Sequence, residues 1–228
     1  MFQNLRKSKK LLLIAMTCAT FAIAGCGSDT TKTTADNGTS VTWSETFDGT
    51  KTDFAVKSAP THAVSMSQAT TEMMLQLSLE DKMAGTAFKE EEIYPPLQAA
   101  YDKVKVLSDK WPSYEVFMSV KPDFATGWPD SFSKRAIPAD KMISQKVNIW
   151  IPESMLSTKA DLETNFSDMI KLGEIFGVKP KAEEWVAGQR KTLAAIQDKL
   201  KDLPRKRVFI YDSEDGQPFT AFEGYTTN

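Results

Sequence analysis

Residues 61–88, THAVSMSQATTEMMLQLSLEDKMAGTAF, decide the fold class. Residues 62–67 follow Pro60 and have the short, apolar-rich character of a strand. Residues 69–79 then place Met73, Met74 and Leu77 at helical spacing, and 82–88 is a second strand candidate. A strand, a helix and a strand in this order favour a right-handed crossover between parallel strands.

The same alternation continues along the chain. Strands are expected at 123–127 and 147–151, a helix at 114–120 capped by Ser113 and stopped by Lys121-Pro122, and a helix at 161–176 ended by Gly177. The sequence therefore predicts an α/β lobe over residues 41–179, with a parallel sheet covered by helices. Its first part, 41–56, alternates around Asp48-Gly49 and is expected to form a hairpin.

A long helix follows this lobe. Pro180 opens it, Pro204 ends it, and residues 180–203 carry an apolar stripe that includes Val186, Leu193 and Ile196. Residues 207–211 are the next strand candidate, in a segment, 204–228, that is expected to begin a second, incomplete lobe. We expect that strand to lack sheet neighbours and residues 205–228 to be the least ordered part beyond the N-terminal linker.

The N-terminus has the pattern of an export signal. Arg6, Lys7, Lys9 and Lys10 precede the apolar run LLLIAMTCATFAIAGC at 11–26, which is too short to span a bilayer comfortably. The exit Ile23-Ala24-Gly25-Cys26 resembles the bacterial lipobox. The resemblance implies a signal peptide over 1–25, lipidation of Cys26 and a flexible linker over 26–40. The alternative is a plain signal peptide with an incidental cysteine. Either way the protein is expected to be extracytoplasmic, and with lipidation it is anchored to the bacterial cell membrane.

Composition excludes several classes of function. Hydrophobic residues make up 41% of the chain and charged residues 25%, as in an ordinary globular domain. Removal of the signal takes four basic residues and no acidic one. The mature chain therefore keeps 24 of the 28 basic residues and all 30 acidic ones, which leaves it with a net negative charge. This balance argues against nucleic acid as a partner. Cys18 leaves with the signal and Cys26 carries lipid, so no disulfide is expected, and the single histidine, His62, excludes a His-rich metal site.

Several short motifs occur in a recognisable order. They are 63–67 (AVSMS) with Thr71-Glu72, then Tyr94-Pro95-Pro96, then Glu115 followed by 120–123 (VKPD), then Gly127-Trp128. Behind a lipobox, this order resembles the helical-backbone solute-binding proteins of bacterial ABC importers. That family has two α/β lobes joined by one long helix and binds ferric siderophores, haem or cobalamin. The resemblance covers residues 60–228 and implies that most of a second lobe is missing from these residues.

The resemblance also implies ligand contacts. Tyr94, Trp111 and Trp128 match positions where the vitamin B12-binding member of the family lines its cleft, and aromatic rings suit a wide, flat ligand. The alternative for each ring is packing against the sheet edge. Trp43 and Trp185 are interpreted as structural, and Trp150 is left undecided. Ser67 opens a helix after the first strand of the sheet, where it either contacts an anionic ligand group or only caps the helix. Lys134 and Arg135 are expected to form a solvated basic turn rather than to neutralise an acidic siderophore.

Two glutamates are candidates for docking. In the family, one exposed glutamate per lobe binds arginines of the permease, and Glu115 and Glu223 are the matching residues here. The alternative for Glu115 is a favourable interaction with its helix dipole. Glu72 is interpreted as a helix-surface residue.

The leading interpretation is a binding protein without catalysis or cofactor, which captures a metal chelate and delivers it to permease and ATPase subunits. A surface-anchored lipoprotein hydrolase is the alternative from another class, and it lacks a Gly-x-Ser-x-Gly motif, a metal-ligand cluster and a second histidine. A third possibility is a surface adhesin, but the α/β pattern does not positively support it.

Overall fold

A five-stranded parallel sheet forms the centre of the fold. The computed structural model describes residues 40–209, 211–214 and 218–220. The strands of this sheet are β3 (Ala63–Ser65), β4 (Met83–Ala87), β5 (Val106–Ser108), β6 (Phe124–Thr126) and β7 (Asn148–Trp150), in the order β5-β4-β3-β6-β7. The predicted α/β class is confirmed. The edge strand β5 was not predicted, because none of its residues is buried and its Val106 is exposed.

Helices cover both faces of this sheet. They are α1 (Gln68–Gln76), α2 (Gln98–Tyr101), α3 (Tyr114–Ser119), α4 (Ala139–Ser144) and α5 (Leu162–Ile175), with short 3-10 turns at η1 (Glu80–Lys82), η2 (Pro95–Leu97), η3 (Pro129–Phe132) and η4 (Glu153–Met155). Phe124 packs with α1 and α5 residues in one buried cluster, and its neighbour Ala125 packs with α3 and α4 residues in the other. Successive strand residues point to opposite faces, so the two clusters lie on the two sides of the sheet.

The predicted helix ends are confirmed where a cap is present. Ser67, Ser113 and Asp161 each accept a backbone N–H at the start of α1, α3 and α5. Gly177, just after α5, adopts the left-handed backbone expected of a C-terminal glycine (φ +70°).

The Lys-Pro-Asp segment at 121–123 also has a structural role. The carboxylate of Asp123 accepts the backbone N–H groups of Thr61 (2.8 Å) and His62 (3.0 Å). These bonds hold the chain entering β3 beside the chain entering β6, so they fix the pairing of the two central strands.

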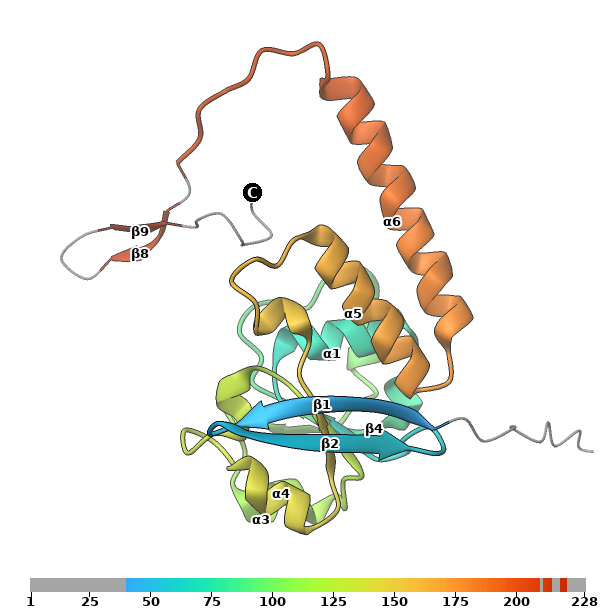
Figure 1. Ribbon diagram of the computed structural model, residues 1–228, viewed down its shortest axis with the longest axis vertical. Coiled ribbons are helices and arrows are strands. Elements are labelled where there is room, and N and C mark those ends of the chain that lie inside the picture. The colour runs from blue at the N-terminus through green and yellow to red at the C-terminus, as the bar shows by residue number, and fades with distance from the viewer. Residues whose placement is uncertain (1–39, 210, 215–217, 221–228) are drawn as a thin grey trace, which may run out of the picture. The chain divides into compact units, whose positions relative to one another are not determined.

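The N-terminal hairpin packs on the edge strand β7. Its strands are β1 (Val41–Phe47) and β2 (Thr50–Val56), and Asp48 and Gly49 both have positive φ, as a tight hairpin turn requires (Figure 1). The Trp43 indole Nε1 donates to the carbonyl of Ile149 (2.7 Å), and its ring stacks on Phe54. The hairpin prediction and the structural interpretation of Trp43 are confirmed.

Glu45 on β1 is buried, and its Oε1 accepts the backbone N–H of Ile151 (3.0 Å). Burial is the main cause that raises the pKa of this carboxyl from 4.5 to about 7; the Ile151 N–H opposes the rise, and the carboxylates of Glu153 and Asp168 add to it. The folded state therefore holds this proton more tightly than the unfolded state. The resulting stabilisation is complete below pH 4.5 and is lost as the pH rises through about 7.

We expect this loss to disappear in Glu45→Gln, whose amide oxygen still accepts the Ile151 N–H but does not titrate. Between pH 5 and pH 8 the free energy of unfolding of the wild type should fall by roughly 2.5 kcal/mol relative to that of the variant. Urea denaturation of both proteins at the two pH values measures this difference. An identical pH dependence for the two proteins would contradict the assignment.

The long helix α6 (Lys179–Leu200) packs against α5, as Figure 1 shows. A Cβ added at Gly173 on α5 would lie 2.6 Å from the Ala182 Cβ on α6, so the absence of a side chain allows this close approach. Trp185 packs edge-on against Phe166, which confirms its structural role. Towards its C-terminal end, α6 leaves Ile196 and Leu200 about half exposed.

One prediction about the C-terminal segment is wrong. Residues 207–209 are not in a strand; β8 begins at Tyr211 (Tyr211–Glu214) and pairs antiparallel with β9 (Pro218–Thr220). The strand at 211–214 therefore has a neighbour, the strand at 218–220. Glu223, Cys26, the signal peptide and nearly all of the linker lie outside the described residues. Within the described ranges, no helix is long and apolar enough to cross a membrane.

Candidate functional site

The candidate site lies where the central strands end. In chain order the five strands have the pattern 3-2-1-4-5, so the chain leaves the neighbouring strands β3 and β6 in opposite directions, toward β4 and toward β7. In open α/β sheets, ligands bind at the carboxyl ends of the strands at this switch point. Met66 follows β3, Phe88 follows β4, and Trp128 follows β6 after one glycine.

These strand ends form a concavity that we name the aromatic hollow. It has a volume of about 400 Å³ and is lined by Phe88, Glu90, Trp111, Trp128, Pro129 and Asp130. Two of the three predicted aromatic ligand contacts, Trp111 and Trp128, therefore lie together, and both rings are only partly buried.

Trp111 is held firmly in the aromatic hollow. Its indole Nε1 donates to the carbonyl of Met66 (3.1 Å), which also accepts the hydroxyl of Ser131 (3.3 Å). Its ring stacks on Phe88 with centroids 4.6 Å apart and planes 24° apart. A ring fixed in this way loses little conformational freedom when a flat ligand binds.

Phe88 is the lining residue that sequence reasoning missed. It is the only aromatic residue among the five described non-glycine residues with positive φ, at 59°. Its position as the last residue of the strand expected at 82–88 was the signal available in the sequence. Lys110 Nζ lies 5.1 Å from the Phe88 ring centroid, so one basic residue flanks the stack.

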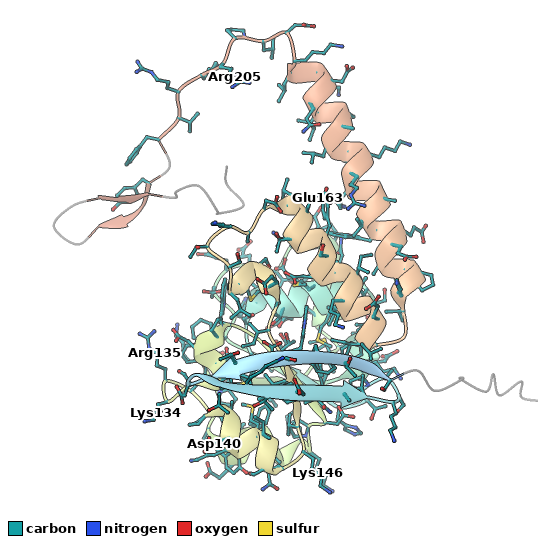
Figure 2. The ribbon with its side chains drawn as sticks, in the orientation of Figure 1. Lys134, Arg135, Asp140, Lys146, Glu163 and Arg205 are labelled. Atoms are coloured by element: carbon teal, nitrogen blue, oxygen red, sulfur yellow. The ribbon has the colours of Figure 1, made fainter. Side chains whose placement is uncertain are left out.

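One charge at the rim of the hollow is paired. Asp130 forms an ion pair with Arg135 (2.5 Å), and Arg135 and its neighbour Lys134 are exposed, as Figure 2 shows. This agrees with the expected solvated basic turn.

Of the two roles that the sequence leaves open for Ser67, the structure shows the cap. Its side chain is fully buried, and its hydroxyl accepts the backbone N–H of Thr70 (3.2 Å) and hydrogen-bonds the Thr70 hydroxyl (2.8 Å). The Ser67 hydroxyl is therefore already satisfied below the surface, and the prediction that it contacts a ligand is not supported by this geometry.

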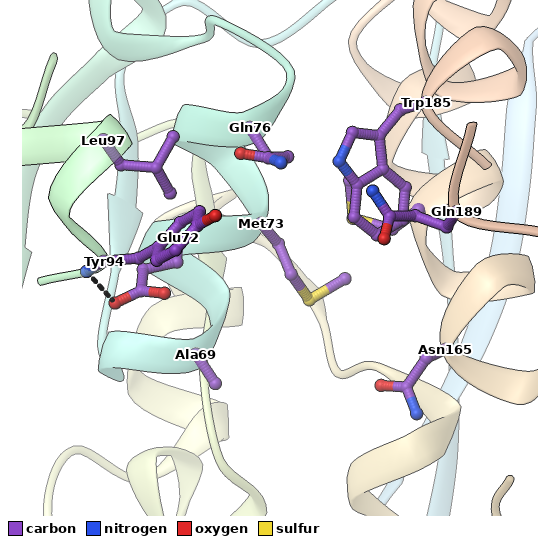
Figure 3. Close-up of a pocket in the computed structure, with 10 residues that line it drawn as sticks. Ala69, Glu72, Met73, Gln76, Tyr94, Leu97, Asn165, Trp185 and Gln189 are labelled. Atoms are coloured by element: carbon purple, nitrogen blue, oxygen red, sulfur yellow. Dashed lines mark hydrogen bonds between the residues drawn. The ribbon is translucent and has the colours of Figure 1, made fainter. Parts of the chain in front are cut away.

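Tyr94 lies apart from the two tryptophans. It is 54% exposed and lines a second concavity of about 390 Å³, which we name the α1–α6 pocket (Figure 3). Its apolar lining includes Met73, Leu97 and Met169, and its polar lining consists of Glu72, Gln76, Tyr94, Asn165, Trp185 and Gln189. Glu72, predicted as a helix-surface residue, accepts the Tyr94 backbone N–H at this pocket (3.2 Å).

Gln68 ties together the loop that connects the two concavities. Its Oε1 accepts the backbone N–H groups of Glu90 (2.9 Å) and Glu91 (2.8 Å), and its Nε2 donates to Glu72 Oε1 (2.9 Å). Glu90 lines the aromatic hollow, and Tyr94, four residues later, lines the α1–α6 pocket. Gln68 therefore fixes the spacing between the two concavities.

Glu115 lies on the surface in the first turn of α3. Hydrogen bonds from its own backbone N–H and from the Ser113 side chain lower the pKa of its carboxyl, and Lys141 lowers it further. The side chain is thus exposed and negatively charged, as docking requires, and it also satisfies the helix terminus. Trp150, which the sequence left undecided, is buried in the core.

Comparisons with known proteins agree with this fold. The model of the periplasmic binding protein family matches residues 64–227. A relative described as the uncharacterized ABC transporter substrate-binding lipoprotein YvrC of Bacillus subtilis is 26% identical over 220 residues, which are 94% of this chain and 67% of the relative. The crystal structure of a periplasmic binding protein from Veillonella parvula is 98% identical, with a TM-score of 0.82 over 84% of this chain and 64% of that protein. The petrobactin-binding protein YclQ of Bacillus subtilis, 20% identical, has a TM-score of 0.59 over 80% of this chain and 61% of that protein, which shows a shared fold.

The fold and the family match define the class. The chain belongs to the periplasmic binding protein family, a class of transport proteins without catalytic activity, and its relative YvrC is described as a substrate-binding lipoprotein of an ABC transporter. Family membership sets aside the alternative of a lipoprotein hydrolase. The chain spans about two thirds of the length of the relatives it matches.

Proposed function

We propose that this protein is the substrate-binding component of an ABC importer for a metal chelate, either a ferric siderophore, haem or cobalamin. The chelate binds at the aromatic hollow, with its flat surface against Trp111, Trp128 and Phe88. The lobe of residues 41–179 carries this surface, the connecting helix of 180–203 follows it, and 204–228 begin a second lobe.

The observation that carries the proposal is the aromatic hollow itself. Three aromatic rings converge at the carboxyl ends of parallel strands, beside the switch point of the sheet. The chain also belongs to a family of transport proteins that bind ligands. Large, rigid rings are the side chains that bury a flat ligand at the smallest entropy cost. The petrobactin-binding relative of this fold supports a siderophore as one candidate.

Delivery requires contact with the permease and ATPase subunits. We assign one docking contact to Glu115, because its carboxylate is exposed and held negative by hydrogen bonds at the start of α3. Glu223 is assigned the matching contact by resemblance to the family.

Absorption spectroscopy of the protein purified from cells tests the proposal. A bound haem or corrinoid gives visible bands, and a bound ferric catecholate colours the sample red. A colourless protein that also takes up none of these compounds on incubation would contradict the proposed function.

Lipidation of Cys26 is expected to hold the protein at the outer face of the cell membrane. Because a bacterial lipoprotein carries several acyl chains on this cysteine, the anchor is stable where a single chain binds only marginally. Cys26→Ala should move the protein from the membrane fraction to the soluble fraction, as measured by immunoblotting of fractionated cells. If the variant stays with the membrane as the parent does, the anchor is not at Cys26.

A further inference from the structure

The chain between β4 and η2 is bound to the first turn of α1 by its main chain. Gln68, the first residue of α1, accepts the backbone N–H groups of Glu90 (2.9 Å) and Glu91 (2.8 Å) at its Oε1. Its Nε2 donates to the backbone carbonyl of Glu92 (3.2 Å) and to Glu72 Oε1 (2.9 Å). One side chain of α1 therefore holds three consecutive residues of this segment.

Glu72 completes this arrangement, which we name the Gln68–Glu72 clamp. Its Oε1 accepts both the Gln68 amide and the backbone N–H of Tyr94 (3.2 Å), the bond drawn in Figure 3. Ile93, just before Tyr94, is buried in the core. Each residue from 90 to 94 is thus anchored, either by the clamp or by burial.

The anchored segment begins beside a strained residue. Phe88 has a φ of 59°, a left-handed conformation that a residue with a Cβ keeps only where its surroundings enforce it. On one side, its own N–H donates to the Ser108 carbonyl of β5 (3.4 Å). On the other side, the clamp takes hold at Glu90, with only Lys89 between. The backbone of Phe88 is therefore fixed from both directions.

This backbone conformation decides where the Phe88 ring lies. The ring stacks on Trp111 with centroids 4.6 Å apart, and both rings line the aromatic hollow together with Glu90. Without the clamp, Phe88 is free to relax to a negative φ, which redirects its side chain and opens one wall of the hollow. A wall that is already in place lowers the entropy cost of binding.

We propose that Gln68 and Glu72 are positioning residues of the ligand site. They are not among the residues that line the aromatic hollow, and they act by holding residues 88–94 so that Phe88 and Glu90 face it. The inference rests on the proposed function, because it concerns affinity for the ligand of the hollow.

Exchanging the two side chains tests this assignment. Gln68→Glu keeps an acceptor for the N–H groups of Glu90 and Glu91 but places a carboxylate against that of Glu72, so the affinity should fall about tenfold. Adding Glu72→Gln restores a carboxamide donor facing a carboxylate acceptor and returns the net charge to that of the wild type. The double variant loses only the bond to the Glu92 carbonyl and should bind within about threefold of the wild type.

Haem, cyanocobalamin and the ferric siderophore ferrichrome are the probes, and the variants are compared with the compound that the wild type binds most tightly. Gln98→Glu is the matched control. The Gln98 Nε2 also donates to an acid four residues later, Asp102 Oδ1 (2.7 Å), at an exposed position on α2. Gln98 is not among the residues that line the hollow, so this variant should leave the affinity unchanged.

Hydrogen exchange of the ligand-free protein provides a second measurement that does not depend on the probe. Peptides that cover residues 88–94, analysed by mass spectrometry, should exchange faster in Gln68→Glu than in the wild type. Adding Glu72→Gln should slow the exchange again.

The outcomes separate this inference from the proposed function. If Gln68→Glu binds as tightly as the wild type, or if adding Glu72→Gln restores neither affinity nor slow exchange, the clamp assignment is wrong while chelate binding stands. A lower melting temperature with unchanged affinity would show a role in stability alone and would also overturn it. If the wild type binds none of the three probes, the proposed function fails, and the inference fails with it.

Discussion

Glu115→Lys, introduced into the chromosomal gene, is expected to abolish uptake of the chelate and to leave its affinity for the protein unchanged. The substitution reverses an exposed charge in the first turn of α3, outside both concavities. Reversing a charge at a docking surface replaces attraction with repulsion and acts on complex formation with the permease. Uptake of radiolabelled ligand into cells and ligand titration of the purified variant measure the two effects separately.

Glu163→Lys is the matched control for Glu115→Lys. Glu163 is also an exposed acid in the first turn of a helix, on α5, where it pairs with Arg190 of α6. Its reversal costs a similar interaction with the helix dipole and also breaks the ion pair with Arg190, so it disturbs the fold at least as much without touching α3. Uptake by Glu115→Lys cells at the rate of the Glu163→Lys control would remove the docking assignment.

Trp128→Ala is expected to lower the affinity for the chelate by about 10- to 100-fold, the usual cost of truncating a central aromatic contact. Trp111→Ala should have a similar effect, because it also removes the ring on which Phe88 stacks. The folded state should survive both changes, since both rings lie beyond the carboxyl ends of the strands and are only partly buried. Equilibrium titration together with thermal unfolding measures affinity and stability on the same samples.

Trp43→Ala distinguishes a ligand contact from a packing role. Its indole lies against the hairpin and Ile149, outside the aromatic hollow, so its loss should reduce stability and leave affinity intact. If Trp128→Ala behaves in the same way, with reduced stability and unchanged affinity, Trp128 belongs to the core and not to a ligand site.

The elements with strong local signals were predictable from the sequence. The Asp48-Gly49 turn, the caps at Ser113 and Asp161 and the Gly177 terminus depend on residues next to one another in the chain. The strand β5 and the helix α4 were missed because both lack a strong local signal: β5 has no buried residue, and α4 has no side-chain cap at its start. The local pattern therefore predicted the main strands and helices, whereas β5 and α4 depend on tertiary contacts.

The candidate site was predictable only in part. Trp128 follows a predicted strand, so the rule that ligands bind at carboxyl strand ends places it at the site. Trp111 follows β5, which was not predicted, so only the resemblance to the family pointed to it. The path of the loop from Phe88 to Tyr94 depends on four hydrogen bonds made by Gln68, and no local pattern encodes them. The resemblance to the family grouped Tyr94 with the tryptophans, and sequence reasoning overlooked Phe88.

The central claim is that the aromatic hollow binds a metal chelate, and quenching of tryptophan fluorescence tests it most directly. The protein, and in parallel the 98% identical protein of Veillonella parvula, would be titrated with ferric siderophores, haem and cobalamin. We expect saturable quenching by one of these ligands with a dissociation constant on the order of 1 μM or lower. Most of that quenching should be lost in Trp111→Ala and Trp128→Ala. The absence of saturable quenching by every ligand in both proteins, or quenching that persists in both variants, would contradict the claim.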